Sequence, residues 1–180
     1  MKIAIMGLGG LGSNISILLA KNRVPSLTIV DFDIVEPSNL NRQHYYVDSL
    51  GMFKTDALKL QLLEINPSMD VITIKDRVTE DNVISYFGDY DIICEAFDNP
   101  MSKAMLINSL LENRPNVKIV SGSGMAGYES ANLIKVHHRF KNLYICGDLH
   151  SEAKVGNGLM SPRVSICAGL QAQTILNIIN

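Results

Sequence analysis

A short apolar strand that runs directly into a glycine-rich turn constrains the fold of this chain more than any other feature. Residues 1–6 read Met-Lys-Ile-Ala-Ile-Met, and Gly7, Gly9, Gly10 and Gly12 lie within the next six positions. Glycines at this spacing, between a strand and a helix, allow a tight turn whose backbone N–H groups approach a phosphate. The pattern predicts the first βα unit of an open parallel sheet with a nucleotide at its edge.

Two aspartates follow the second apolar strand, which covers residues 27–30. Asp31 and Asp33 lie roughly 20 positions beyond the glycine turn, where an acidic side chain accepts hydrogen bonds from ribose hydroxyls. Enzymes that use NAD or a flavin show the same combination. The glycines and aspartates alone therefore indicate a nucleotide without choosing between these cofactors and ATP.

The loop after the aspartates is more specific, because it contains Asn39, Arg42 and Gln43. A guanidinium can donate two parallel hydrogen bonds to phosphate oxygens. A hydride-transfer enzyme has no need of such a group beside the ribose unless it binds NADP, whereas an enzyme that cleaves ATP does. Lys54 begins the next helix and adds positive charge at a helix end that already favours anions.

Strand-like and helix-like segments alternate along most of the chain. Expected helices cover residues 11–21, 53–65, 79–87 and 101–112, and expected strands cover residues 70–75, 91–96 and 117–121. Two further strands, over residues 131–137 and 143–146, are predicted to form an antiparallel hairpin. We expect an α/β fold: a Rossmann-like, doubly wound, mainly parallel sheet that the hairpin extends. An apolar helix over residues 161–180 should be buried in the fold or in an interface.

Composition narrows the class of protein. The 180 residues predict a single ATP-binding domain over positions 1–180. A net charge of −2 gives no reason to expect nucleic-acid or membrane binding. No signal peptide or apolar run long enough to span a bilayer is present. Three separated cysteines argue against a disulfide framework and favour a cytoplasmic protein.

Four loops are expected to meet at the carboxyl edge of this sheet, where open α/β folds bind ligands. They are residues 7–12, 31–43, 98–99 and 121–127. Asp98 directly follows a buried strand and is a candidate ligand for a Mg²⁺ ion that bridges phosphate oxygens. Asp98 and Asn99 could instead only cap the next helix.

These residues suit the adenylation of a carboxylate. A carboxylate is already a nucleophile near neutral pH, so the reaction requires no general base. The barrier lies in bringing an anion to the α-phosphorus of ATP and in stabilising the leaving pyrophosphate. Positioning and cationic groups therefore supply most of the catalysis, and we interpret Arg42, Lys54 and Asp98 as the groups that act in it.

The chain contains successive motifs at residues 7–12, 31–33, 38–43, 54 and 98–99. In this order they resemble the motifs of the ThiF/MoeB/HesA family, the bacterial relatives of ubiquitin-activating enzymes. The short length and the Leu-Met-Ser-Pro-Arg segment near the end of the chain are most similar to the short, ThiF-type branch of that family, which is linked to thiamine biosynthesis. The resemblance implies an adenylyltransferase that uses ATP and Mg²⁺ on the C-terminal glycine of a ubiquitin-like sulfur carrier such as ThiS. It also implies a homodimer. Residues matching Asp31, Asn39, Arg42, Gln43 and Lys54 bind ATP in that family, and the one matching Asp98 holds the metal.

The chain also departs from the family pattern. It lacks the two Cys-x-x-Cys pairs of zinc-containing members, so no structural zinc is expected. Many members supply an arginine to the neighbouring site from an amino-terminal extension, and here Arg163 is a candidate replacement. Cys146 approximately matches the position of a sulfur-handling cysteine, although a small buried residue is the more usual role of a free cysteine.

Three alternatives stay open at this point. One is an NAD-dependent oxidoreductase, for which no acid or base stands out. A second is a relative that adenylates a different carrier or a peptide, or that acts on a tRNA base. A third is a partner-binding module without catalytic activity, against which Arg42, Lys54 and Asp98 argue.

Overall fold

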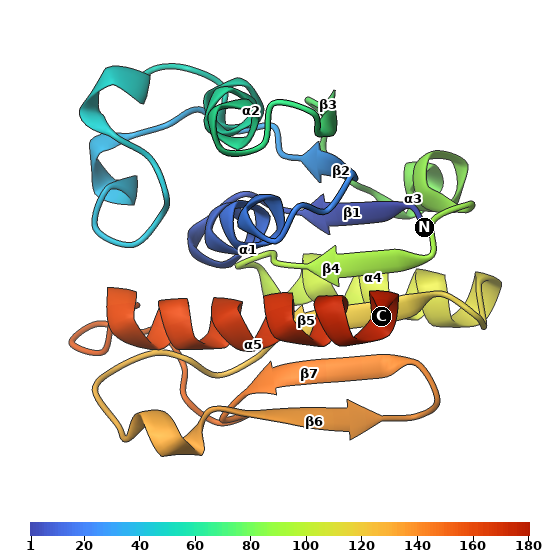
Figure 1. The fold of residues 1–180 in the computed structure, drawn as a ribbon. Coiled ribbons are helices and arrows are strands. Elements are labelled where there is room, and N and C mark those ends of the chain that lie inside the picture. Colours follow the sequence, from blue (N-terminus) through green and yellow to red (C-terminus); the bar gives the residue numbers. More distant parts are fainter.

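The structure is a computed structural model that describes residues 1–180. Seven strands and five helices alternate along the chain, with three short 3₁₀ turns (Figure 1). The strands are β1 (Ile3–Met6), β2 (Ser26–Val30), β3 (Asp70–Ile74), β4 (Ile92–Glu95), β5 (Lys118–Gly122), β6 (Lys135–Arg139) and β7 (Leu143–Gly147). The helices are α1 (Gly10–Lys21), α2 (Lys54–Ile65), α3 (Glu80–Phe87), α4 (Pro100–Asn113) and α5 (Ser161–Ile179), and the 3₁₀ turns are η1 (Pro37–Asn39), η2 (Val47–Ser49) and η3 (Ala131–Leu133).

All seven strands form one sheet in the order β3-β2-β1-β4-β5-β7-β6. Every neighbouring pair is parallel except β6 and β7, which are antiparallel. The order reverses between β1 and β4, and such a reversal opens a crevice at the carboxyl ends of the strands. The predicted α/β fold, with a parallel sheet extended by an antiparallel hairpin, is confirmed.

Alternating side chains of the central strands serve two separate cores. In β1, Ile3 and Ile5 pack with α1, α2 and α5, whereas Ala4 and Met6 pack with α3 and α4 on the other face. All four β1 side chains are buried, as a strand covered on both faces requires. Helices thus cover both faces of the sheet beneath the crevice, and Figure 1 shows α5 beside α1 on the nearer face.

The hairpin begins later than its sequence pattern predicts. Residues 131–133 form the turn η3, in which the Ser130 side chain accepts a hydrogen bond from the Asn132 N–H at 3.3 Å. This local bond gives the backbone an alternative to strand pairing. The first strand of the hairpin therefore starts at Lys135, at the exposed edge of the sheet.

The closing helix α5 is buried mainly within the fold. Val164, Cys167, Ala168 and Ile175 join the same core as α1, although Ile166 is 38% exposed. No helix of the structure is both long enough and apolar enough to cross a membrane.

Candidate functional site

A cavity of about 790 Å³ opens at the carboxyl ends of the central strands. Residues from all four predicted loops line its wall, so the structure brings these segments together as the topology predicts. The predicted site residues on the wall are Gly7, Gly9, Gly10, Asp31, Asp33, Arg42, Gln43, Lys54 and Asp98. Gly12 and Asn39 are not among its lining residues.

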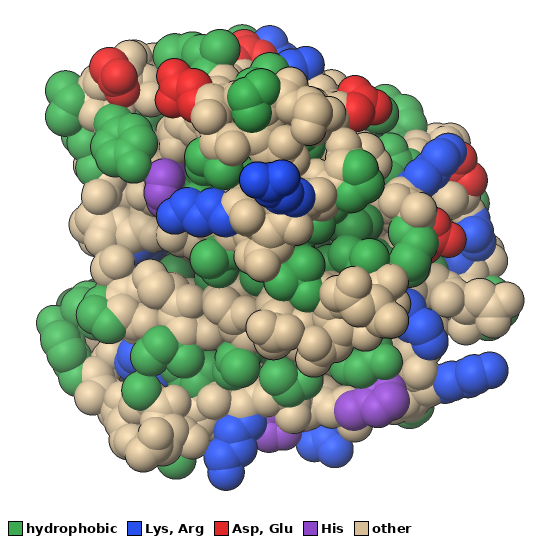
Figure 2. All heavy atoms as spheres, viewed as in Figure 1, with side chains coloured by type: hydrophobic (Ala, Val, Ile, Leu, Met, Phe, Trp, Pro, Cys, Tyr) green, Lys and Arg blue, Asp and Glu red, His purple; other side chains and the backbone are tan.

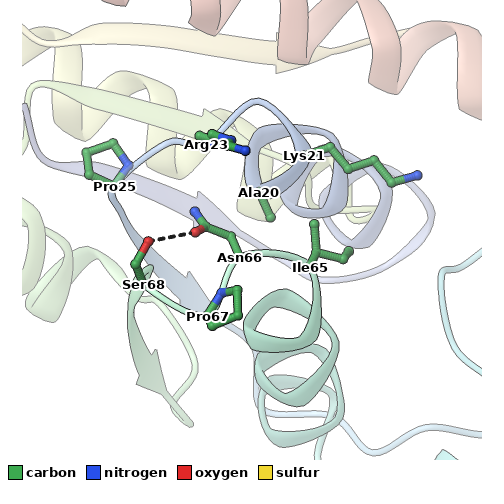
Figure 3. A pocket seen from close by; sticks show the side chains of 8 residues that line it. All are labelled: Ala20, Lys21, Arg23, Pro25, Ile65, Asn66, Pro67 and Ser68. Atoms are coloured by element: carbon green, nitrogen blue, oxygen red, sulfur yellow. Dashed lines mark hydrogen bonds between the residues drawn. The ribbon is translucent and has the colours of Figure 1, made fainter.

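A second cavity, of about 510 Å³, lies at the opposite edge of the sheet, beside the start of β2 (Figure 3). Lys21, Arg23 and Asn66 are among its lining residues, and Ser68 donates a hydrogen bond to Asn66 at 2.9 Å. It contains no carboxylate, thiol or imidazole. The groups that the sequence assigns to nucleotide chemistry all lie at the other edge.

The glycine turn is compact because its members leave no room for side chains. Gly7 has a φ of +88°, and a Cβ there would lie 2.9 Å from the carbonyl oxygen of Ala96. A Cβ on Gly12 would lie 1.8 Å from the carbonyl oxygen of Gly7. Helix α1 starts at Gly10 with no side-chain cap, so N–H groups of its first turn remain available to an anion. Gly12 thus shapes the turn without lining the cavity.

Asp31 joins the glycine turn to the second strand. Its carboxylate accepts hydrogen bonds from the N–H groups of Leu8, at 2.6 Å, and Asp33, at 2.8 Å. Burial raises the pKa of Asp31 above its usual value, although these two N–H groups work to lower it. Each carboxylate oxygen can accept a second hydrogen bond. Asp31 can therefore receive a ribose hydroxyl while it holds the turn in place.

Asp33 and Lys54 form an ion pair on the cavity wall. The ammonium of Lys54 donates to the Asp33 carboxylate at 2.9 Å. The lysine side chain is only 7% exposed, whereas that of Asp33 is 50% exposed. Lys54 is therefore a positioned, largely desolvated cation and not a solvated lysine on a helix surface, and its ammonium keeps N–H donors for a phosphate after donating to Asp33.

Arg42 and Gln43 contain buried polar atoms without hydrogen-bond partners. These atoms are Nε of Arg42 and Oε1 of Gln43, and both residues line the cavity. Gln43 is 8% exposed. A buried polar group without a partner costs free energy, so its presence at a cavity indicates a ligand that supplies the missing hydrogen bonds. A donor and an acceptor are available here, as a nucleotide requires.

Asn39 stabilises the loop that follows the two aspartates. Its Oδ1 accepts a hydrogen bond from the Glu36 N–H at 3.0 Å within the turn η1. The residue is 7% exposed and does not line the wall. In this structure Asn39 stabilises the segment that carries Arg42, and the ATP contact that the family resemblance implies for it stays a prediction.

The sequence left open whether Asp98 and Asn99 only cap the next helix or whether Asp98 is available for a metal, and the two side chains differ in their contacts. Asn99 caps α4, because its side chain accepts hydrogen bonds from the N–H groups of Met101 and Ser102, at 2.9 and 3.0 Å. Asp98 is exposed, lines the cavity, and makes no hydrogen bond or ion pair in the structure. Its carboxylate is free for a hard cation such as Mg²⁺.

Two structural observations correct the sequence-based candidates. Cys146 is 0% exposed in β7, and burial raises the pKa of its thiol to about 11. Sulfur-handling cysteines need an accessible thiolate, so Cys146 is a core residue. Arg163 does not line the cavity: its guanidinium donates to the Asp148 carboxylate and to the carbonyl oxygens of Glu129 and Ser130. It is therefore no replacement for an arginine from a neighbouring subunit.

The ion pair of Arg163 and Asp148 instead links α5 to the segment that follows β7. Asp148 also accepts hydrogen bonds from the N–H groups of His150 and Ser151, at 2.9 and 2.8 Å. Burial works to raise the pKa of Asp148, but these donors outweigh it and the pKa is lowered. The segment that starts here contributes Ser151, Glu152 and Ala153 to the cavity.

We expect Asp148→Asn to lower the free energy of unfolding by roughly 3 kcal/mol, because it leaves the buried Arg163 without its counter-charge. Urea denaturation at pH 7 measures this value. The difference in unfolding free energy between the variant and wild type should shrink as the pH falls below about 4. The pKa of Asp148 is lowered, so its carboxylate becomes protonated in the wild-type protein only below that pH. Asp89→Asn, which breaks an exposed pair with Lys2, should leave the midpoint unchanged. An equal loss in both variants would contradict a buried role for Asp148.

Sequence reasoning missed two charged residues at this site. Glu95 ends β4 and is 0% exposed, and Lys103 of α4 lines the cavity and pairs with it. The acid within the apolar run of residues 92–96 is a signal for Glu95, because an acidic side chain is buried only when paired. Lys103 carries no such signal, since a lysine in a helix is usually solvated.

The whole chain, residues 1–180, matches the sequence model of the ThiF family. The chain belongs to the ThiF family. It is 37% identical over 124 residues to the adenylyltransferase and sulfurtransferase UBA4 of Scheffersomyces stipitis, a match that covers 68% of this chain and 28% of that protein. It is 35% identical over 125 residues to the molybdopterin-synthase adenylyltransferase of Haemophilus influenzae, covering 69% and 51%.

A third relative of this ThiF-family chain is the tRNA threonylcarbamoyladenosine dehydratase of Escherichia coli, 32% identical over 136 residues, with 74% of this chain and 50% of that protein covered. The crystal structure of that enzyme in complex with ATP superimposes with a TM-score of 0.89 at 22% identity, over 99% of this chain and 85% of the other. The chain thus shares the fold of a protein that binds ATP. It spans about half or less of these curated relatives.

Proposed function

We propose that this ThiF-family chain uses ATP to adenylate the C-terminal glycine carboxylate of a small ubiquitin-like sulfur carrier of the ThiS type, in thiamine biosynthesis. The observation that carries the proposal is the pair of buried, unpartnered polar atoms of Arg42 and Gln43 in the cavity. They lie in one cavity with the glycine turn, the desolvated Lys54 and the free carboxylate of Asp98. The phosphate oxygens of ATP can accept from Arg42 and Lys54, and its ribose hydroxyls and adenine amino group offer the donor that the Gln43 oxygen lacks.

Each residue has a defined part in this reaction. Asp31 orients the ribose, and the first turn of α1 binds phosphate oxygens through its N–H groups. Arg42 and Lys54 hold the triphosphate and offset the charge that develops on the leaving pyrophosphate. The carrier carboxylate forms a bond to the α-phosphorus as the bond to pyrophosphate breaks, and no proton is transferred.

The residues at the site also suit Mg²⁺, which prefers oxygen ligands and retains waters and phosphate oxygens around it. Asp98 supplies an accessible carboxylate with no competing partner. When bound, the ion would neutralise phosphate charge. Asp98 would hold it, and Asn99 keeps Asp98 in position by capping α4.

The names of relatives support adenylation more broadly than they support ThiS. Two of the relatives above are named adenylyltransferases, one of them for molybdopterin synthase. A different carrier is therefore the nearest alternative. The dehydratase relative, named for a tRNA nucleoside, favours a second candidate function in which the chain acts on RNA. The net charge of −2 argues against a large RNA-binding surface.

A homodimer is part of the proposal. Figure 2 shows that apolar and uncharged side chains cover most of the face over α5. Ile166 on this helix is 38% exposed, and Val136 on the adjacent sheet edge is 41% exposed. Exposed apolar side chains on one face favour association between proteins. A second copy of the chain is the partner that the family resemblance implies.

ATP–pyrophosphate exchange tests the proposed function. Exchange of labelled pyrophosphate into ATP should require ThiS with an intact C-terminus, should not depend on NAD, and should stop when EDTA removes Mg²⁺. ThiS without its terminal glycine is the matched control. Exchange with the carrier subunit of molybdopterin synthase but not with ThiS would show that the chain adenylates a different carrier. Exchange that requires tRNA would favour the second candidate function.

A further inference from the structure

Lys103 is a fourth cation on the wall of the cavity, and the reaction described above gives it no role. The other three are Arg42, Lys54 and Arg77, which all belong to the part of the chain between β2 and α3. Lys103 lies on α4, which follows β4. Its side chain is 23% exposed, and its ammonium pairs with the carboxylate of Glu95. Lys103 therefore reaches the cavity from an element that follows β4, which lies on the other side of β1 from β2 and β3.

Glu95 holds this ammonium in a fixed position. The acid is 0% exposed, and its Oε1 accepts a hydrogen bond from the Phe97 N–H at 2.7 Å. Its Oε2 accepts from the Ser121 hydroxyl, at 2.6 Å, and from Lys103. An ammonium has three N–H donors, and Glu95 is the only partner of Lys103 in the structure. Two donors therefore remain for a ligand in the cavity.

The surroundings of Glu95 locate Lys103 relative to the nucleotide. On one side, Gly7 of the glycine turn lies against Ala96, the residue after Glu95. On the other side, Ser121 lies near the end of β5, and the segment 122–126 that continues from it lines the cavity. Lys103 is thus held between the phosphate-binding turn and the 122–126 segment.

A second anion has to enter this part of the cavity if a carboxylate is to attack ATP. Coulomb repulsion from the triphosphate opposes its approach, most strongly where water is excluded. In the proposed function, Arg42 and Lys54 hold the triphosphate. An ammonium on a different element, already positioned by a buried acid, can donate hydrogen bonds to the incoming oxygens and orient them.

We propose that Lys103 binds the carboxylate of the incoming acyl substrate, and that Glu95 is the positioning residue that holds the Lys103 ammonium. This inference rests on the proposed function, because it assumes a carboxylate substrate. Two N–H groups of Lys103 donate to the carboxylate oxygens before the bond to phosphorus forms. The lysine neither gains nor loses a proton.

The experiment compares two forms of ThiS, one with its C-terminal carboxylate and one with a C-terminal carboxamide. Binding is measured by isothermal titration calorimetry in the presence of α,β-methylene-ATP, which does not release pyrophosphate. Wild type should bind the carboxylate form more tightly than the carboxamide by roughly 10-fold or more, the effect of a charge-assisted hydrogen bond. The double variant Lys103→Met with Glu95→Gln should reduce this preference to less than about 2-fold.

The double variant is used because Lys103→Met alone leaves a buried carboxylate without its counter-charge and is liable to unfold. Lys103→Arg, which keeps the charge, should retain part of the preference. Lys141→Met removes an exposed lysine from the turn between β6 and β7, and it should behave as wild type. Affinity for α,β-methylene-ATP alone should stay within about 2-fold of wild type in all of them.

Three results would overturn the inference, and they differ in what else they affect. A double variant that still prefers the carboxylate shows that another group binds it, and the proposed function stands. A large loss of affinity for α,β-methylene-ATP shows that Lys103 serves the nucleotide. If wild type itself does not distinguish the two forms of ThiS, the inference and the proposed carrier fail together.

Discussion

Arg42→Ala should lower ThiS-dependent ATP–pyrophosphate exchange by roughly 100-fold or more, the cost of losing a preorganised charge at a transition state. The guanidinium makes only two hydrogen bonds, to the Ser38 carbonyl at 3.2 Å and to Asn41 at 2.9 Å, and its Nε has no partner. Most of its donor capacity is therefore free for phosphate. The exchange rate at saturating ATP and ThiS is the measurement.

The fold should survive this change, because the side chain of Asn14, and not the guanidinium, fixes the backbone there. Its amide donates to the Arg42 carbonyl oxygen at 3.0 Å. Arg42→Lys should recover part of the activity, since a lysine restores the charge without the planar pair of donors. Arg139→Ala on the exposed edge strand β6 is the matched control. Normal exchange by folded Arg42→Ala protein would show that the triphosphate lies elsewhere.

Gly12→Ala should lower the free energy of unfolding by roughly 3–5 kcal/mol, the range typical of a substitution that cannot be accommodated. A Cβ at this position would lie 1.8 Å from the carbonyl oxygen of Gly7 and 3.1 Å from the side chain of Ile5. The first contact is with backbone, so relief requires the turn and the start of α1 to separate. Urea denaturation followed by far-ultraviolet circular dichroism measures the loss.

The same substitution elsewhere in the chain provides the comparison. Gly169 lies within α5, and a Cβ there would meet no atom within 4 Å. Gly169→Ala should therefore raise the free energy of unfolding by roughly 0.5–1 kcal/mol, because alanine loses less conformational entropy than glycine in a helix. If Gly12→Ala were as stable as wild type, the turn would have to differ from the one described.

Much of the fold follows from local sequence patterns. The apolar runs of β1, β2 and β4 predict buried strands, since side chains on both faces of a parallel sheet must be apolar. Glycine and proline mark many of the boundaries. The predicted edges fail where a local hydrogen bond competes with strand pairing, as at Ser130.

The residues of the site also include some that the sequence predicts and one that it does not. The shared location of Gly7, Asp31, Arg42 and Asp98 could be predicted from their order along the chain, because parallel topology brings the carboxyl ends of strands together whatever the loops do. Lys103 could not be assigned in this way. A lysine in a helix has the same sequence pattern whether it is solvated or paired with a buried acid.

Local pattern was thus sufficient for the α/β fold, the parallel orientation of most of its strands and the loops that meet at the nucleotide edge. Only the tertiary structure shows that Cys146 is a core residue, that Arg163 forms an ion pair with Asp148, and that Lys103 lines the cavity. The physical reason is that these roles depend on burial and on partners. Arg163 meets Asp148, and Lys103 meets Glu95, only through the packing of the helices against the sheet.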